Sequence, residues 1–265
     1  MANGQVRITP DVAEVLSKGN GAGKIYRLPP GHLDRKLYIA AAKVLEALGG
    51  KWNRKAGAFL GSEGFHSKVR DALSAGHAVD ADKRDAFFRT PPAVAAKVVE
   101  LLGALPLGAR VLEPSCGEGA LLVALVEGNE WEPFLVIATE LNADRAAAAA
   151  DAAPWASARI YNEDFLTVPA AVYGGKFTHI LMNPPWGAGR EYAHVLHALA
   201  LLAPGGRLVA VLPQGVCWRD NKRAHAFCAA LSGAGTYDIH DLPAHSFRSS
   251  GTDVAACILV LDKES

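Results

Sequence analysis

The chain has 265 residues, of which 50% are hydrophobic and 20% charged, with 27 basic and 27 acidic side chains. This length and composition permit one α/β domain of ordinary size and a small additional unit. No apolar run approaches a membrane span, and the N-terminus lacks the apolar core of a signal peptide. We therefore expect a cytoplasmic protein rather than a membrane-embedded or exported one.

The charges are unevenly divided along the chain. Residues 1–84 hold 14 Lys+Arg against 8 Asp+Glu, whereas residues 85–265 hold 13 against 19. This asymmetry indicates a small basic N-terminal unit, residues 1–84, that contacts a polyanion, followed by a domain, residues 85–265, that is suited to a cationic ligand. A merely solvated basic surface would give the same counts, so that alternative stays open.

The N-terminal unit is predicted to mix helices and strands. Its pattern indicates a helix over Asp34 to Leu48, a stop at Gly49-Gly50, a hairpin-like stretch over Lys51 to Leu60, and a helix near His66 to Ala75.

The hairpin-like stretch carries the candidate nucleic-acid contacts. Lys51, Arg54 and Lys55 are close together, and a basic hairpin can straddle a phosphate backbone. Trp52 and Phe59 are at odd spacing for one face, so at least one of them is expected to pack inward.

From residue 85 onward, predicted helices and strands alternate, which is typical of a parallel sheet covered on both sides. A helix opens at Pro91-Pro92 and runs through Val98-Val99. Seven strands follow, at Val111, Val136, Arg159 to Tyr161, Ile180, Leu208 to Leu212, Tyr237 to Ile239, and Ala255 to Leu261.

The segment Ala109 to Gly119 reads as a strand, a tight glycine turn and a helix start. Gly117 and Gly119 allow the backbone to approach a ligand closely. Glu113, just before the turn, suits an ammonium group rather than a phosphate. A phosphate-binding loop is excluded, because no Lys-Ser/Thr pair follows the glycines.

The next predicted strand, Phe134 to Thr139, ends at Glu140. An acid in this position can accept hydrogen bonds from both hydroxyls of a ribose, as in dinucleotide-binding folds. A lone acid after a strand is also commonly a solvated cap, and its position in series with the glycine turn favours the ligand role.

The apolar run Thr178 to Met182 reads as a buried strand, and Asn183-Pro184-Pro185-Trp186 follows at its carboxyl end. Open α/β sheets bind ligands at this edge. The two prolines remove backbone donors and stiffen the turn, which leaves the Asn183 amide and the Pro184 carbonyl as fixed acceptors. Such a cup suits a planar amine, for example the amino group of an adenine whose ring lies on Trp186. The alternative is a proline-terminated strand with a structural tryptophan.

These segments together resemble the amino-methyltransferases that use S-adenosylmethionine, specifically the family that methylates the exocyclic N6 amine of adenine in DNA. The resemblance covers the chain from about Asp85 to its C-terminus and extends to the phage or mobile-element type. Its parts are Phe88-Arg89-Thr90-Pro91, then Glu113-Pro114-Ser115-Cys116-Gly117-Glu118-Gly119, then Glu140, Asp164-Phe165 and Asn183-Pro184-Pro185-Trp186.

The resemblance implies a doubly wound, mostly parallel, Rossmann-like methyltransferase domain with S-adenosyl-L-methionine as its cofactor. Thr90 and the Gly117 turn would hold the methionine end of the cofactor, Glu140 its ribose, and Asp164 its adenine amino group, with Phe165 on the ring. Asn183, Pro184 and Trp186 would hold the target base. The implied cofactor site is Phe88, Thr90, Pro91, Glu113, Pro114, Ser115, Cys116, Gly117, Gly119, Glu140, Leu141, Asp164, Phe165 and Asn183, and the catalytic segment is Asn183, Pro184, Pro185 and Trp186.

A polar loop between the last two strands, Leu242 to Thr252, contains one exposed-looking aromatic, Phe247. A base drawn out of its stack needs two covered faces, so Phe247 is a candidate second plate opposite Trp186. Its alternative is a ring tucked under the loop.

The chemistry is expected to be direct transfer without a covalent nucleophile. Methylation of a cytosine carbon requires a Pro-Cys pair, and none of the four cysteines follows a proline. Cys116, Cys217, Cys228 and Cys257 are scattered, so we expect neither a disulfide nor a metal site. His194 and His197 indicate a half-buried helix face rather than a metal pair.

Target recognition differs from the family pattern. Sequence-specific relatives carry a large recognition domain after the catalytic tetrapeptide, whereas 79 residues follow Trp186 here. We therefore expect recognition by the N-terminal unit and loops, with a short or relaxed sequence preference. Three alternatives remain at this stage: methylation of adenine N6 in RNA, methylation of a protein glutamine, and a noncatalytic DNA-binding module.

Overall fold

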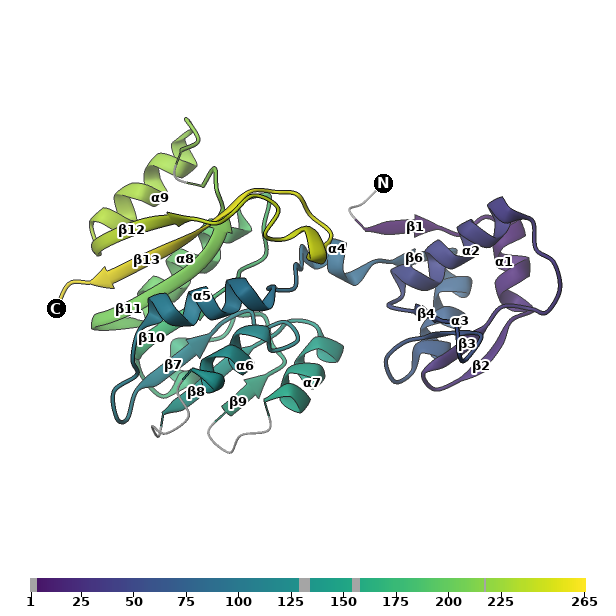
Figure 1. The fold of residues 1–265 in the computed structure, drawn as a ribbon, viewed down its shortest axis with the longest axis horizontal. Helices are drawn as coiled ribbons and strands as arrows, with labels where there is room; N and C mark the ends of the chain where they lie inside the picture. The colour runs from purple at the N-terminus through teal and green to yellow at the C-terminus, as the bar shows by residue number, and fades with distance from the viewer. Residues whose placement is uncertain (1–3, 129–133, 154–157, 217) are drawn as a thin grey trace. The chain divides into compact units, whose positions relative to one another are not determined.

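The computed structural model describes residues 4–128, 134–153, 158–216 and 218–265 (Figure 1). The chain divides into two compact units, Met1–Phe87 and Phe88–Ser265, so the division lies close to the position that the change in charge indicates. Each unit has its own hydrophobic core. Among the described helices, none combines the length and apolar character that a bilayer crossing requires.

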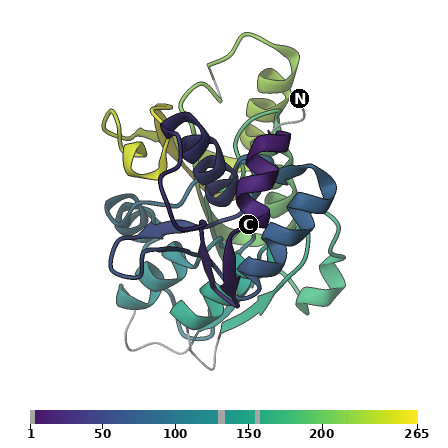
Figure 2. The same ribbon diagram turned by 90° about the vertical axis from the view of Figure 1, so that its right-hand side faces the viewer.

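The N-terminal unit is built from short strands packed against helices. Helix α1 packs against both α2 and α3 (Figure 2). Four antiparallel strands form a sheet of order β2-β3-β5-β4, and β1 pairs with β6. The elements are β1 (Gln5–Arg7), α1 (Pro10–Ser17), β2 (Asn20–Ala22), β3 (Ile25–Arg27), α2 (Arg35–Ala47), β4 (Lys51–Asn53), β5 (Ala58–Leu60), α3 (Phe65–Ala75), β6 (His77–Val79) and α4 (Ala81–Asp85).

The predicted elements of this unit are confirmed. The Asp34 side chain caps α2 by accepting from the backbone N–H groups of Lys36 and Leu37, which fixes the start of the helix at the predicted residue. Strands β4 and β5 form the predicted hairpin, and α3 covers the predicted range.

The hairpin also explains the two aromatics. Trp52 and Phe59 face each other across it in register, so they share one face of the sheet, with ring centroids 5.2 Å apart. Phe59 is 1% exposed and Trp52 49%, which confirms that at least one packs inward.

The second unit is the predicted seven-stranded, doubly wound, mostly parallel sheet. The strand order is β12-β13-β11-β10-β7-β8-β9, and β13 is antiparallel to both of its neighbours. The strands are β7 (Arg110–Glu113), β8 (Leu135–Thr139), β9 (Ala158–Tyr161), β10 (Phe177–Met182), β11 (Leu202–Pro213), β12 (Gly235–Asp241) and β13 (Ala256–Lys263).

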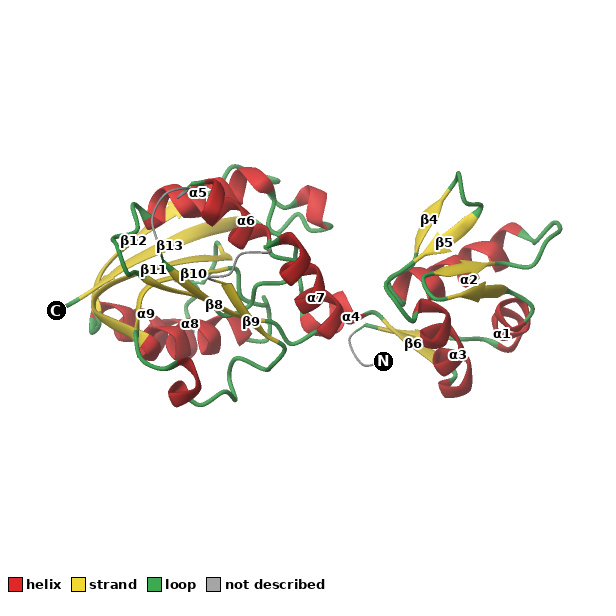
Figure 3. Ribbon diagram, turned by 90° about the horizontal axis from the view of Figure 1, so that it is seen from below, coloured by secondary structure: helices red, strands yellow, loops and turns green. Residues whose placement is uncertain are grey.

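Helices cover both faces of this sheet (Figure 3). Helices α5 (Pro92–Leu102), α6 (Ala120–Glu127) and α7 (Ala143–Ala152) pack on one face, while α8 (Arg190–Leu201) and α9 (Lys222–Ser232) pack on the other. Alternate strand residues, for example Val111 and Leu112, enter opposite cores. This burial on both faces explains why the strands read as nearly continuous apolar runs.

Candidate active site

Three polar segments meet at the carboxyl edge of the sheet. Strand β7 ends at Glu113 and continues into the glycine turn, β8 is followed by Glu140, and β10 is followed by Asn183. Because β10, β7 and β8 are adjacent and parallel, these three segments lie beside one another. The fold therefore brings the predicted base-binding and cofactor-binding segments to the edge where such sheets bind ligands.

The Asn183 amide is held in one orientation. Its Nδ2 donates hydrogen bonds to the carbonyl oxygen of Phe88 at 3.1 Å and to Oγ1 of Thr90 at 3.0 Å. A carbonyl oxygen can only accept, so the nitrogen of the amide must face Phe88. Oδ1 is consequently directed away from these partners, and it is buried without a hydrogen-bond partner among the described residues. Leaving a buried acceptor unpaired costs about 1–3 kcal/mol, so this oxygen is suited to a donor from a ligand.

The aromatic residues near Asn183 form a closed cluster. Trp186 is 6% exposed, its indole N–H points to the carbonyl of Val211, and its ring centroid lies 5.2 Å from that of Phe88 and 4.8 Å from that of Phe247. Phe247 is 1% exposed. Of the two alternatives for Phe247, the structure therefore shows the ring tucked under the loop, and Trp186 has no open stacking face in this arrangement.

The loop around Phe247 is polar but anchored. Its short 3-10 helix, η2 (Arg248–Ser250), is bonded to the segment before α5: Ser250 Oγ donates a hydrogen bond of 2.6 Å to the carbonyl of Arg89. Folding back in this way carries the single aromatic side chain into the core, where it meets Trp186 edge to face. Polar composition predicted the loop correctly but could not reveal this anchor.

The glycine turn after β7 has the conformation that its sequence predicts. Gly117 and Gly119 have φ angles of 56° and 85°, in the left-handed region that favours glycine. A Cβ at Gly119 would lie 3.2 Å from Cα of Ala149, so the turn also packs closely against α7. Thr139 Oγ1 donates to the carbonyl of Pro114 at 2.8 Å and fixes the turn to β8.

Glu113 is a buried carboxyl group at this turn. It is 1% exposed, and its Oε2 has no hydrogen-bond partner within the described residues. Burial, together with the charge of Glu140, raises the pKa of Glu113 well above its usual value. The same burial raises the pKa of the Cys116 thiol, which stays protonated and is unsuited to nucleophilic attack. A cationic group bound here would favour the ionised form of Glu113 and pair with it.

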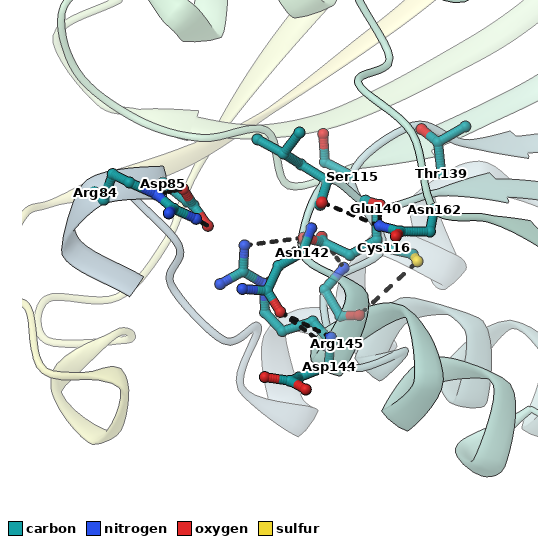
Figure 4. A network of polar contacts seen from close by, with 12 residues as sticks. Arg84, Asp85, Ser115, Cys116, Thr139, Glu140, Asn142, Asp144, Arg145 and Asn162 are labelled. Atoms are coloured by element: carbon teal, nitrogen blue, oxygen red, sulfur yellow. Dashed lines mark hydrogen bonds and ion pairs between the residues drawn. The ribbon is translucent and has the colours of Figure 1, made fainter. Parts of the chain in front are cut away.

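Glu140 is the centre of a polar network rather than a free acceptor (Figure 4). Its Oε1 accepts a hydrogen bond from the backbone N–H of Asn142 at 2.8 Å. The same oxygen accepts from Nε of Arg145 at 3.0 Å and lies 2.9 Å from Nη2 of that side chain. The other oxygen, Oε2, accepts from the backbone N–H of Gly117 at 3.0 Å. Both residues of the ion pair are 6% exposed. The lone pairs of Oε1 are thus occupied by hydrogen bonds, whereas Oε2 retains an open lone pair. The prediction that Glu140 is free to accept both hydroxyls of a ribose is therefore wrong for this structure.

Sequence reasoning missed Arg145 and Asn162. Arg145 lies in the first turn of the alanine-rich helix α7, five residues after Glu140. A single cation in such a helix, so close after an acid, was the signal in the sequence that could have indicated the ion pair. Asn162 Nδ2 donates to the carbonyls of Glu140 and Leu141 at 2.8 and 3.0 Å, and so fixes the segment that carries the acid.

The segment after β9 contains Asp164 and Phe165, which were predicted to contact the adenine of the cofactor. Asp164 is half-buried and its Oδ1 accepts from the N–H of Leu166. Phe165 is 2% exposed and packs against His194 and His197 of α8, with ring centroids 5.9 and 4.7 Å away. The prediction that Phe165 covers the cofactor ring is wrong here, because its ring belongs to the core. Leu141, by contrast, is 56% exposed.

A separate cavity of about 940 Å³ lies between α5 and α6. It shares Thr90 and Gly119 with the predicted cofactor site, but Glu113, Glu140 and Asn183 do not line it. Arg89 and Glu118 form an ion pair among its lining residues. Because the segments with ligand chemistry lie elsewhere, we place the candidate active site at the carboxyl edge of the sheet.

Comparison with known proteins gives one family match. A family model described as N-6 DNA Methylase matches residues 176–265, which include Asn183–Trp186 and the last four strands. No curated protein gives a sequence match to the chain.

Solved structures show the same fold. The type I restriction-modification methyltransferase subunit of Streptococcus thermophilus is 20% identical with a TM-score of 0.58, over 74% of this chain and 49% of that one. A modification subunit of a putative type I restriction enzyme from Vibrio vulnificus YJ016 is 18% identical with a TM-score of 0.57, over 96% and 60%. A putative class I S-adenosylmethionine-dependent methyltransferase from Listeria monocytogenes is 15% identical with a TM-score of 0.56, over 87% and 73%.

The second unit therefore has the Rossmann-like fold of these methyltransferase structures. S-adenosyl-L-methionine is the cofactor that the sequence resemblance implies. The resemblance to the adenine-N6 DNA methyltransferase family is confirmed by the match over residues 176–265. The chain spans about half of the S. thermophilus subunit and three fifths of the V. vulnificus one. The residues present fit this cofactor in one respect: Glu113 offers its ammonium group a buried carboxyl oxygen that has no hydrogen-bond partner among the described residues.

The Glu113→Gln variant is expected to become more stable than the wild type, in the absence of ligand, as the pH rises. Above the ordinary pKa of 4.5 the unfolded chain releases the Glu113 proton while the folded chain keeps it, so the wild-type free energy of unfolding falls with rising pH until the raised pKa is passed. The variant has no carboxyl group at this position and therefore lacks this pH-dependent loss of stability. Urea unfolding between pH 5 and 8 should show a growing advantage of Glu113→Gln, whereas Glu127→Gln, at an exposed site, should follow the wild type. Parallel pH profiles of Glu113→Gln and the wild type would contradict the assignment.

The Glu140–Arg145 pair is expected to be a major structural contact. Arg145→Met leaves a buried carboxylate without its cation and should lower the free energy of unfolding by about 3 kcal/mol. The double variant Glu140→Gln/Arg145→Met removes both charges and should recover most of that loss in urea denaturation. A single variant that is as stable as the wild type would show that Arg145 does not hold Glu140.

Proposed function

We propose that the chain transfers a methyl group from S-adenosylmethionine to the exocyclic N6 amine of adenine in DNA. One observation carries the proposal: the Asn183 amide is anchored through its nitrogen, and its buried oxygen, which has no hydrogen-bond partner among the described residues, is available to an amine. A neutral adenine amino group has two hydrogens to donate, and the Pro184 carbonyl is a second acceptor beside the Asn183 oxygen. Accepting both hydrogens would turn the nitrogen lone pair toward the incoming carbon.

The protein's contribution to this reaction is alignment. When bound, the sulfonium of the cofactor supplies an electrophilic methyl group. The Asn183 oxygen would hold the amine in line with that carbon, and a carboxamide cannot take up a proton at neutral pH, so it acts as an acceptor rather than a base. The two prolines fix the backbone on either side of this contact.

The proposed cofactor contacts use the carboxyl edge from Phe88 to Asp164. Thr90 and the turn from Pro114 to Gly119 would hold the methionine end, and Glu113 its ammonium. The open lone pair of Glu140 Oε2 would accept one ribose hydroxyl, and Asp164 would accept from the adenine amino group. Pro91 and Leu141 would complete the walls of the site.

Binding of the target base would require the aromatic cluster to open. A base can lie on Trp186 only if Phe247, which now contacts that ring at a centroid distance of 4.8 Å, moves aside with its loop. Exclusion of water by the returning loop would then leave the amine and the methyl carbon in a dry site.

The N-terminal unit is the proposed DNA anchor. Lys51, Arg54 and Lys55 are exposed on the β4–β5 hairpin, and none forms an ion pair within the described part of the chain. Their turn is stiffened by Asn53, whose Oδ1 accepts from the N–H of Ala56 at 2.9 Å. Unpaired cations on a rigid hairpin suit a phosphate backbone. Recognition by this unit and by loops would give a short or relaxed sequence preference, which mapping of methylated adenines would test.

Parallel transfer assays separate the possible substrates. The full chain and labelled S-adenosylmethionine are incubated with DNA, with RNA of the same sequence and with protein, and the products are digested and identified. The proposal predicts label in DNA as N6-methyladenine. Label confined to RNA or to a protein glutamine would replace the proposed substrate, and no transfer to any of the three would refute an enzymatic role.

Asn183→Ala is expected to reduce methyl transfer by at least about 100-fold, because it removes the acceptor that positions the amine. Cofactor affinity, measured by calorimetry, should change much less, since the other cofactor contacts remain. Asn20→Ala, at an exposed site in the N-terminal unit, is the matched control and should keep full activity. An active Asn183→Ala enzyme would rule out the proposed role of this amide.

A further inference from the structure

The loop between β11 and α9 carries the most exposed large aromatic side chain in the described part of the chain. Trp218 is 72% exposed, compared with 49% for Trp52 and 37% for Tyr38. Exposing an indole ring of this size forgoes the burial that usually stabilises tryptophan. Since Trp186 and Phe247 are buried, Trp218 is the tryptophan at this edge that can meet a ligand without rearrangement.

This loop is fastened to the segment that follows the catalytic tetrapeptide. Nη1 of Arg223 donates to the carbonyl of Ala188 at 3.0 Å, and Tyr192 Oη donates to the carbonyl of Val216 at 3.1 Å. The close approach depends on Gly189, where φ is 82° and a Cβ would lie 2.0 Å from Nη1 of Arg223. Trp218 is therefore carried at the rim of the proposed target site.

A buried carboxylate links the same two segments. Glu191 is 1% exposed; its Oε2 accepts from the N–H of Gly187 at 2.9 Å, and its Oε1 lies 4.0 Å from Nη1 of Arg219. The acid sits in the first turn of α8, where the helix dipole favours negative charge. One side chain thus holds both the loop after Trp186 and the loop that bears Trp218.

The rim is basic although the domain is acidic. Arg219, Lys222 and Arg223 are exposed around Trp218, whereas residues 85–265 as a whole carry 13 basic side chains against 19 acidic ones. The nearby acid Asp220 is 99% exposed and lies 3.4 Å from Nε2 of His225. Cations concentrated beside an aromatic ring are the combination that binds a nucleic-acid strand.

We propose that four side chains bind the DNA strand next to the target adenine: Trp218 stacks on a neighbouring base, and Arg219, Lys222 and Arg223 contact its phosphates. This assignment rests on the proposed function. Drawing an adenine out of its stack uncovers the faces of its neighbours, and an exposed indole at the rim of the site can cover one of them.

Fluorescence anisotropy with the full chain and a labelled, adenine-containing single-stranded oligonucleotide tests the stacking contact. Trp218→Ala should weaken binding by about 10-fold, and Trp218→Phe, which keeps an aromatic face, should stay within about 3-fold of the wild type. Because Trp218 is exposed, the thermal unfolding of both variants should match the wild type.

The phosphate contacts are tested by salt dependence. Lys222→Ala should reduce the slope of log affinity against log salt by about 1, whereas Arg159→Ala, on the far edge strand β9, should leave it unchanged. Wild-type affinity and slope in Trp218→Ala and Lys222→Ala would overturn the inference. Failure of the proposed function would look different: the wild type would bind the oligonucleotide through Trp218 but transfer no methyl group to it.

Discussion

The candidate site depends on the pair of hydrogen bonds that hold the Asn183 amide. They join residues 95 and 93 positions apart in the sequence, and so bring the Phe88–Thr90 segment against the end of β10. With its nitrogen engaged, the amide cannot rotate without losing both bonds. The acceptor oxygen is thereby positioned before any substrate arrives, which is the preorganisation that a reaction limited by alignment requires.

Buried acids are the second feature that organises this edge of the sheet, and each makes different contacts. Glu140 is paired with Arg145 and capped by backbone N–H groups, and Glu191 holds two loops together. Glu113 forms no ion pair within the part of the chain that the structure describes, and burial raises its pKa. In our interpretation, Glu140 and Glu191 build the site through these contacts, while Glu113 is left to bind a positively charged ligand.

The sequence allowed the order of elements to be predicted because both faces of the main sheet are covered, so that its inner strands β7, β8, β10, β11 and β13 appear as apolar runs. It also placed Asn183 at a strand end, because two prolines cannot continue a strand. The capped start of α2 was similarly visible from Asp34.

What the sequence could not provide were contacts between distant segments. Ser250 reaches Arg89 and draws Phe247 into the core, and Arg145 reaches back to fill one oxygen of Glu140. Phe165 was assigned to the cofactor from its neighbour Asp164, although its ring packs under α8. Each of these errors concerns the direction of a side chain, which local pattern does not fix. Trp218 was overlooked because no motif surrounds it.

The most direct test of this account is a structure of the full chain with an inert S-adenosylmethionine analogue and an adenine-containing oligonucleotide. The account predicts that N6 of the target adenine lies about 2.7–3.2 Å from Oδ1 of Asn183, with the amide nitrogen still bonded to Phe88 and Thr90. An adenine bound elsewhere, or an Asn183 amide turned so that its nitrogen faces the base, would contradict it.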